Sequence, residues 1–230
     1  MCFMGLILVP EGAWWTYVDE VERASLALRD QDACYYYLVH TPGGFEESEA
    51  NSRIANFKKD PVKWKNTPSW YYKGRSIEQF SEDIASFLLA PGLVPLLQSQ
   101  NDIAIAPMPT SKPRNHPSFD NRLELLCESV AKKVPGIRLE NPFDLPKEIT
   151  AAHLGGSRMI GYLEQQIEFK GFQNLPAVLF LVDDVLTTGA HFVACSRLVE
   201  ARHPQIKIIG LFLARHRQQQ PRIQFAVQKP

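Results

Sequence analysis

The stretch AVLFLVDDVLTTGAHFVACSRLV, residues 177–199, decides the fold expected for this chain. It opens with a continuous apolar run, 177–182, whose β-branched and aromatic content is typical of a strand buried on both faces of a parallel sheet. Two adjacent carboxylates, Asp183 and Asp184, come where this strand is expected to end. Small hydroxyl and glycine residues follow, and apolar residues then recur at helical spacing. The stretch therefore predicts a strand, a tight loop and the start of a helix.

The expected loop carries groups that can hold a phosphate. A helix N-terminus presents unpaired backbone N–H groups and the positive end of its dipole, and a glycine lets an anion approach the backbone closely. Thr187 and Thr188 add hydroxyl donors beside Gly189. The two preceding carboxylates repel a phosphate, but they can accept hydrogen bonds from sugar hydroxyls or bind the water shell of Mg²⁺. Phosphate on one side and hydroxyls on the other describe a ribose 5-phosphate.

Residues 179–190, LFLVDDVLTTGA, resemble the phosphoribosyl diphosphate (PRPP) binding motif of type I phosphoribosyltransferases, and the strand IKIIGLFLARH, 206–216, adds similarity to the ComF-like branch. The resemblance implies an α/β fold with a doubly wound, mostly parallel sheet. It also implies transfer of a phosphoribosyl group to or from a nitrogen-containing acceptor, with pyrophosphate as co-product and with Mg²⁺ accompanying PRPP. Asp183 and Asp184 would hold the ribose hydroxyls and are the candidate magnesium ligands. The implied 5-phosphate loop consists of Val185, Leu186, Thr187, Thr188, Gly189, Ala190 and His191.

A second polar loop is expected at the same edge of the sheet. Residues 102–106 have the pattern of a short buried strand, and PMPTSKPRNHPSFDNR, 107–122, follows it. In a doubly wound sheet ligands bind at the carboxyl ends of the strands, so the two loops should flank one crevice. This loop resembles the pyrophosphate loop of the family, with a solvated basic loop as the alternative. Its expected pyrophosphate-binding residues are Thr110, Ser111, Lys112 and Arg114, and Asn115, Asp120, Asn121 and Arg122 are loosely similar to the family pattern.

Residues 145–173 are rich in glycine and polar side chains and lie between two expected core strands. In the family the comparable region is a flexible loop that closes over the diphosphate and excludes water. Arg158 is the expected diphosphate contact from this region, and an arginine on a helix surface is the equal alternative. Together with Asp183 and Asp184 it makes up the expected catalytic set.

Three departures from the family pattern limit what the resemblance implies. Thr187 stands where purine-salvage relatives often have an aspartate that acts as general base, and threonine cannot accept that proton. His191 stands where most of the family has a threonine that contacts the 5-phosphate. The cysteine-rich zinc module of many ComF-like proteins is missing. These departures leave a second class open, a regulatory or interaction module that binds PRPP or a nucleotide without transferring the sugar.

Residues 1–90 do not resemble the family core, so we expect an N-terminal α+β elaboration there and the phosphoribosyltransferase-like core in 91–230. Within the first part, Arg53–Arg75 is strongly basic and interleaved with aromatic residues. Such a composition suits nucleic-acid binding, an acceptor-substrate lid or a partner surface, while aromatic packing beside solvated lysines is the simpler interpretation. The aromatic residues are Trp64, Trp70, Tyr71 and Tyr72, and the basic ones are Arg53, Lys58, Lys59, Lys63, Lys65, Lys73 and Arg75.

The totals restrict the partners. A formal net charge of zero over 230 residues gives no global electrostatic case for a nucleic acid or a membrane. The four cysteines are scattered without a CxxC pair, which is typical of reduced thiols in a cytoplasmic protein. The apolar opening MCFMGLILVP lacks a basic flank and is interpreted as a first strand, and no run is long enough to span a membrane. The resemblance allows a homodimer and leaves the acceptor unknown.

The expected elements follow from the same periodicities. Besides the stretch at 177–199, the expected strands are 5–9, 34–41, 102–106, 137–143, 206–214 and 222–227, and the expected helices are 18–29, 77–89 and 119–133.

Overall fold

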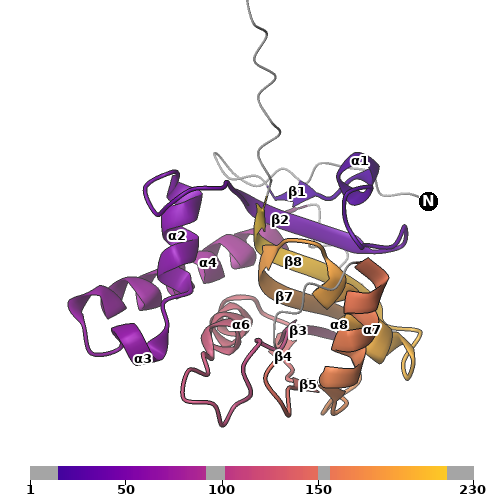
Figure 1. The fold of residues 1–230 in the computed structure, drawn as a ribbon. Coiled ribbons are helices and arrows are strands. Elements are labelled where there is room, and N and C mark those ends of the chain that lie inside the picture. Colours follow the sequence, from indigo (N-terminus) through magenta and orange to yellow (C-terminus); the bar gives the residue numbers. More distant parts are fainter. Residues whose placement is uncertain (1–14, 92–101, 150–155, 217–230) are drawn as a thin grey trace, which may run out of the picture.

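The computed structural model describes residues 15–91, 102–149 and 156–216 and is built around one six-stranded sheet (Figure 1). The strands lie in the order β1-β2-β8-β7-β3-β4, and all neighbouring pairs are parallel except β1 with β2. This confirms the predicted mixed α/β fold with a mostly parallel sheet. The strands are β1 Thr16–Tyr17, β2 Ala33–His40, β3 Ile103–Pro107, β4 Ile137–Leu139, β7 Val178–Leu186 and β8 Lys207–His216.

Helices cover both faces of the sheet, as a doubly wound fold requires. Along β7, Phe180 and Val182 pack into one core cluster while Leu179 and Leu181 pack into the other. This alternation explains why the strand is apolar throughout, since each face needs its own apolar residues. The first cluster lies under α2 Glu49–Phe57, α4 Tyr71–Leu88 and α6 Arg122–Lys133, and the second lies under α7 Gly156–Gln166 and α8 Ala190–Glu200 (Figure 1).

The N-terminal part of the chain contributes directly to the central sheet. β2 pairs in parallel with β8, in a register that sets Ala33 opposite Ile209 and His40 opposite His216. The helices α2 and α4, together with the short α3 Pro61–Trp64 and the 3-10 turn η1 Pro68–Trp70, follow β2. The division near residue 91 into an elaboration and a core stays a prediction.

Several expected elements differ in length from those in the structure. The helix predicted over 18–29 is only α1, Glu20–Arg23, because Arg23 donates from Nη1 to the carbonyl of Arg29 (3.0 Å) and holds the following chain in a turn. The strand predicted over 137–143 divides into β4 and β5, Phe143–Asp144, and β5 pairs with β6, Glu168–Phe169, in a separate two-stranded sheet. The expected strands 5–9 and 222–227 lie outside the described residues.

The structure also describes the environment of three cysteines and the apolar character of the helices. The three cysteines in the described part of the chain, Cys34, Cys127 and Cys195, are buried free thiols. Burial raises the pKa of the Cys34 and Cys127 thiols. None of the helices that the structure describes has the length and apolar character needed to cross a bilayer.

Candidate functional site

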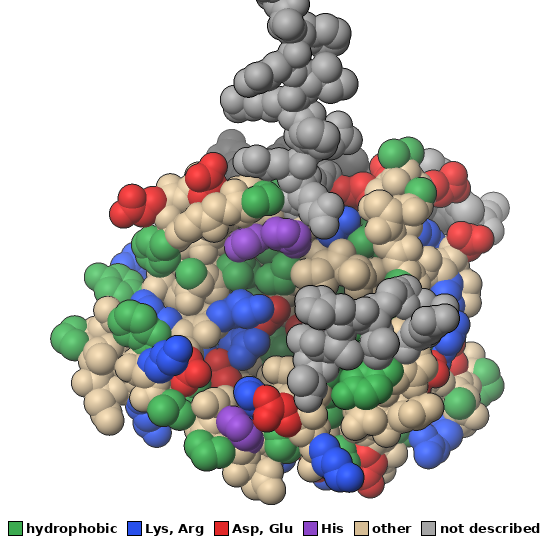
Figure 2. Space-filling view, in the orientation of Figure 1, with side chains coloured by type: hydrophobic (Ala, Val, Ile, Leu, Met, Phe, Trp, Pro, Cys, Tyr) green, Lys and Arg blue, Asp and Glu red, His purple; other side chains and the backbone are tan. Residues whose placement is uncertain are grey.

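The carboxyl ends of four parallel strands meet at one edge of the sheet and bring the predicted loops together. The N–H of Met108, just after β3, donates to the carbonyl of Val182 in β7 (2.9 Å), so the second loop starts beside Asp183. β2 and β8 end at the same edge with His40 and His216. On the face shown in Figure 2, histidine side chains lie together above a group of basic and acidic side chains.

The paired acids lie within β7, whereas the sequence suggested that they follow it. The strand continues to Leu186 because its parallel pairing with β8 extends beyond them, with Val185 opposite Ala214. Successive side chains of a strand point to opposite faces. Accordingly, Asp183 contacts α8 through His191, while Asp184 lies on the face covered by α2 and α6.

The loop after β7 has the geometry of an anion site. Gly189 has φ +80° and forms the N-cap of α8 without a side-chain cap. The hydroxyl of Thr188 accepts the N–H of Ala190 (3.3 Å). The N–H groups of Thr187, Thr188 and Gly189 meet no acceptor in the described part of the chain. Unpaired N–H groups beside a helix N-terminus attract anions.

The carbonyl groups of this loop, in contrast, already have donors. Arg215 donates from Nη1 to the carbonyls of Leu186 (3.1 Å) and Thr187 (2.9 Å), and Ala27 donates its N–H to the carbonyl of Thr188 (2.7 Å). The predicted loop residues fall into three elements. Val185 and Leu186 belong to β7, the residues from Thr187 to Gly189 form the turn, and Ala190 and His191 begin α8.

Asp184 is part of a largely buried chain of ion pairs, in which Lys58 alone is exposed. Its Oδ1 accepts from Lys58 Nζ (3.2 Å) and its Oδ2 from Arg122 Nη2 (2.5 Å). Arg122 Nη1 also contacts Asp120 Oδ2 (2.9 Å), which accepts from Lys73 Nζ as well (2.7 Å). We call these five residues the charge network. Three cations face two carboxylates within it.

The charge network joins elements far apart in the sequence. Lys58 follows α2, Lys73 lies in α4, and Asp120 and Arg122 lie at the start of α6. Burial would raise the pKa of Asp184, but Lys58 and Arg122 outweigh it and hold that pKa below its usual value. The carboxylate is therefore ionised at neutral pH and its charge is compensated.

Asp183 is also engaged by protein donors. Its Oδ1 accepts the N–H of Asp184 (2.8 Å), and its Oδ2 lies 3.1 Å from Nδ1 of His191. Burial works to lower the pKa of His191, but the neighbouring Cys195 and Asp183 raise it well above 6.5. His191 Nε2 is buried and has no hydrogen-bond partner among the described residues.

Two histidines meet at the ends of β2 and β8. Nδ1 of His40 lies 3.1 Å from Nδ1 of His216, so one ring donates and the other accepts. Burial, the neighbouring His216 and the charge of Lys58 together lower the pKa of His40. A neutral imidazole at this edge can accept a proton.

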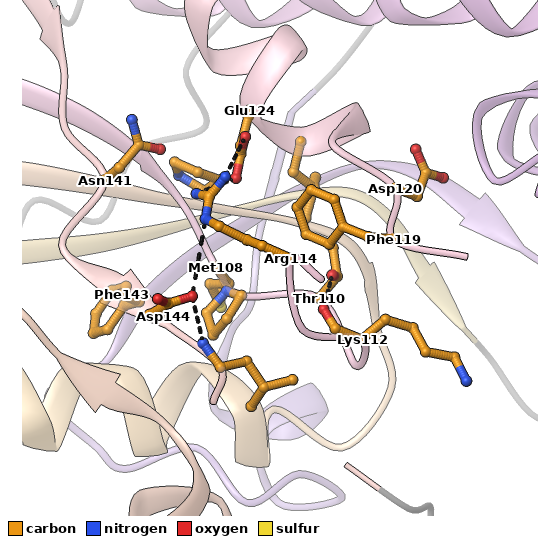
Figure 3. A pocket seen from close by; sticks show the side chains of 14 residues that line it. Met108, Thr110, Lys112, Arg114, Phe119, Asp120, Glu124, Asn141, Phe143 and Asp144 are labelled. Atoms are coloured by element: carbon orange, nitrogen blue, oxygen red, sulfur yellow. Dashed lines mark hydrogen bonds and ion pairs between the residues drawn. The ribbon is translucent and has the colours of Figure 1, made fainter. Parts of the chain in front are cut away.

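The predicted pyrophosphate loop lines a solvent-open pocket with about 410 Å³ of empty space (Figure 3). Arg114 lies between two acids in this pocket, with Nη2 2.5 Å from Glu124 Oε1 and Nε 3.8 Å from Asp144 Oδ1. Lys112 pairs with Glu148. The cations of this loop are therefore already paired with acids from other segments, which the loop sequence alone could not show.

The remaining predicted residues are less informative. Thr110 lines the pocket, and its hydroxyl donates to the carbonyl of Lys112 (3.2 Å). Ser111 is exposed, and its carbonyl accepts the N–H of Ile149 (3.0 Å). Arg158 belongs to α7, but its side chain lies outside the described residues.

Sequence reasoning did not assign Lys58, Lys73, His40 or His216 to the site. The clustering of basic residues in 53–75 was a visible signal for the two lysines, but its interpretation was left open between aromatic packing beside solvated lysines, an acceptor-substrate lid, a nucleic-acid surface and a partner surface. The loose similarity at Asp120 and Arg122 pointed to the correct edge of the sheet without indicating their partners.

The residues at this edge do not fit a magnesium ion held by the paired acids. Each of the four carboxylate oxygens of Asp183 and Asp184 already lies on a protein donor. Across the residues that the structure describes, no group of three or more His, Cys, Asp and Glu side chains could hold a metal ion.

Comparison with known proteins identifies no relative by sequence, since no family model and no curated protein matches the chain. Two crystal structures of a hypoxanthine phosphoribosyltransferase from Staphylococcus aureus match parts of the fold. The tetragonal form matches with 8% identity and a TM-score of 0.35, over 60% of this chain and 62% of that one. The orthorhombic form matches with 10% identity and a TM-score of 0.32, over 63% and 67%. The chain thus spans less than two thirds of the first, and a likeness this distant concerns the fold alone.

Proposed function

We propose that this protein binds PRPP and transfers its phosphoribosyl group to a nitrogen-containing acceptor. The observation that carries the proposal is the loop Thr187–Gly189, with its unpaired N–H groups beside a helix N-terminus and directly after two carboxylates. The loop suits the 5-phosphate, and the side chains at the ends of the neighbouring strands suit the rest of the ligand.

In this reaction the bond between C1 of the ribose and the diphosphate oxygen breaks, and its electron pair leaves with pyrophosphate. A bond from the acceptor nitrogen to C1 forms, and that nitrogen loses a proton. Cations around the departing diphosphate stabilise the negative charge that develops on it. Lys58 and Arg122 supply such cations, and Asp183, whose side chain is more exposed than that of Asp184, is the better acceptor for a ribose hydroxyl.

The histidine pair supplies a proton acceptor, which the threonine at position 187 cannot be. The lowered pKa of His40 keeps its ring neutral at pH 7, and the ring lies close enough to Lys58 for that charge to act on it. His40→Gln should therefore lower the rate of pyrophosphate release more than the affinity for PRPP.

The first experiment is calorimetric titration with PRPP of the wild type and of Thr187→Val and Thr188→Val, with Thr67→Val as a matched control far from the loop. A loop variant that loses a hydrogen bond to phosphate should bind about tenfold more weakly, and the control should bind like the wild type. Wild-type protein that shows no PRPP binding, while inorganic phosphate or another nucleotide binds, would contradict the proposal.

A second assay separates an enzyme from a regulatory module with the same ligand. Pyrophosphate release is measured with a panel of purines, pyrimidines and amines as acceptors. Release with one acceptor class indicates a transferase. Tight PRPP binding without release from any acceptor favours the non-catalytic module, which the departures at Thr187 and His191 leave open.

A nucleic-acid surface is a second candidate function, supported by exposed aromatic residues in α3 and α4. Tyr71 is 68% exposed, and Trp64 and Tyr72 are also exposed, while Lys59 Nζ lies 5.7 Å and 5.2 Å from the ring centroids of the latter two. Stacking rings beside cations suit single-stranded nucleic acid. Binding of a labelled oligonucleotide that weakens with salt and on replacing Lys63 and Lys65 with Gln supports this function, and binding insensitive to both removes it.

A further inference from the structure

The charge network places a cation on each carboxylate oxygen of Asp184. We propose that Lys58 and Arg122 take the place of a divalent cation at Asp184, so that the chain binds the diphosphate of PRPP without a protein-held magnesium ion. This inference rests on the proposed function, and it assigns Lys58, from the N-terminal part, as a ligand-binding residue.

Both carboxylate oxygens of Asp184 are already occupied by cationic side chains. Asp184 Oδ1 lies 3.2 Å from the Lys58 ammonium, and Oδ2 lies 2.5 Å from the Arg122 guanidinium. Magnesium requires near-octahedral oxygen ligands and keeps several of its waters. A carboxylate with a cation on each oxygen and a side chain only 9% exposed has neither the space nor the uncompensated charge for that shell.

The charge network carries a net positive charge. Lys58, Lys73 and Arg122 exceed Asp120 and Asp184 by one positive charge. The Asp183 carboxylate has the imidazole of His191 as its own partner, whose raised pKa favours the charged form. Without these cations, the carboxylates at this edge of the sheet would repel a diphosphate. With them, the edge attracts one.

Lys58 keeps N–H donors that its ion pair with Asp184 does not use. An ammonium has three N–H donors, and the Lys58 side chain is 44% exposed, so its other donors can reach a ligand. Arg122 Nε is buried and has no partner among the described residues. Lys58 can thus bind Asp184 and an anionic ligand together, which is the bridging arrangement that a metal ion would otherwise provide, while Arg122 neutralises the second carboxylate oxygen.

The main test compares PRPP binding in EDTA and in magnesium by calorimetry. The wild type should bind in both buffers with affinities equal within about twofold. The affinity of Lys58→Met for PRPP should be about tenfold or more below that of the wild type in EDTA, as expected for the loss of one charge-assisted hydrogen bond. Magnesium should restore part of this affinity. Lys58→Arg keeps the charge and should retain binding in EDTA. Lys132→Met, which removes a 72% exposed lysine paired with Glu128, is the matched control.

Wild-type binding that disappears in EDTA and returns with magnesium would overturn the inference while leaving the proposed function intact. A wild type that binds PRPP in neither buffer would instead remove the proposed function. For that case a second measurement judges the charge network by itself.

This second measurement is a titration with magnesium alone, followed by calorimetry and by the thermal unfolding midpoint. The wild type should show no binding, because Lys58 and Arg122 occupy Asp184. Lys58→Met should gain a magnesium-dependent rise in its midpoint, and adding Asp184→Asn should abolish that rise. Magnesium binding by the wild type that Asp184→Asn removes would contradict the inference independently of PRPP.

Discussion

Gly189 is the residue on which the phosphate loop depends most directly. Its φ of +80° is costly for residues with a side chain, and a Cβ there would lie 2.7 Å from Cδ2 of Leu28. We expect Gly189→Ala to lower the unfolding free energy by about 1–3 kcal/mol, measured by urea denaturation. The double variant with Leu28→Ala should separate the clash from the backbone cost. An unchanged unfolding free energy in the single variant would show that the loop adopts another conformation.

His191 should make stability depend on pH. Its pKa is raised on folding, so its contribution to the unfolding free energy is complete below its ordinary pKa of 6.5 and is lost as the pH rises through the folded value. The difference in unfolding free energy between wild type and His191→Gln should therefore shrink above pH 6.5. Asp183→Asn should move this loss to lower pH. A difference that stays constant with pH would contradict the assigned pKa shift.

For single residues, the sequence indicated which residue types lie at the candidate site but not which side chains form ion pairs there. The order of acids, threonines and glycine in 183–189 predicted the loop, since that order is local. The partners of Asp184 were not predictable, because Lys58 and Arg122 reach it from segments 126 and 62 positions away. For the same reason the acids around Arg114 could not be foreseen from the basic loop that contains it.

Among the elements, α4 holds the backbone at the end of α2 through the buried side chain of Lys73. Lys73, only 4% exposed, donates from Nζ to the carbonyls of Phe57 (2.7 Å) and Lys59 (3.0 Å) and to Asp120. Lys73→Met should lower the unfolding free energy by about 3 kcal/mol, because it leaves a buried carboxylate and two carbonyls without this donor. Urea denaturation measures the loss.

A double variant checks the origin of that loss. Lys73→Met combined with Asp120→Asn should be less destabilised than the sum of the two single variants, since the buried charge is then removed with its partner. The exposed Lys132→Met should change the unfolding free energy by less than about 0.5 kcal/mol. Strict additivity of the two buried substitutions would mean that the ion pair is not the cause.

The elements were predictable where one face or both faces of a segment are uniformly apolar. The runs at β2, β3, β7 and β8 were identified with ends shifted by one to four residues, because burial leaves a continuous apolar pattern. The helix over 18–29 was predicted too long, since its charged periodicity cannot show that Arg23 turns the chain toward the carbonyl of Arg29. β5 and β6 depend only on each other, so neither has a local signal.

On the scale of the whole molecule, the two parts separated near residue 91 share one sheet and one core. β2 covers an edge of β8, and residues of α4 such as Phe80 and Ile84 belong to the same cluster as Leu126 of α6. A chain of residues 92–230 alone should therefore show no cooperative unfolding transition in urea, as followed by circular dichroism. A sharp transition of that fragment would instead show that residues 92–230 fold as a unit without the N-terminal part.

The position of β8 in the sheet affects how the protein can be synthesised. β8 is the last strand of the described chain to leave the ribosome, yet it lies between β2 and β7 and joins them. Until then β2 has a free edge toward β8, and the loop closed by its pairing is the longest in the sheet, which slows folding. A nascent chain therefore carries an exposed apolar strand during most of its translation. Such a strand attracts chaperones and other unpaired strands until β8 has been synthesised and pairs with it.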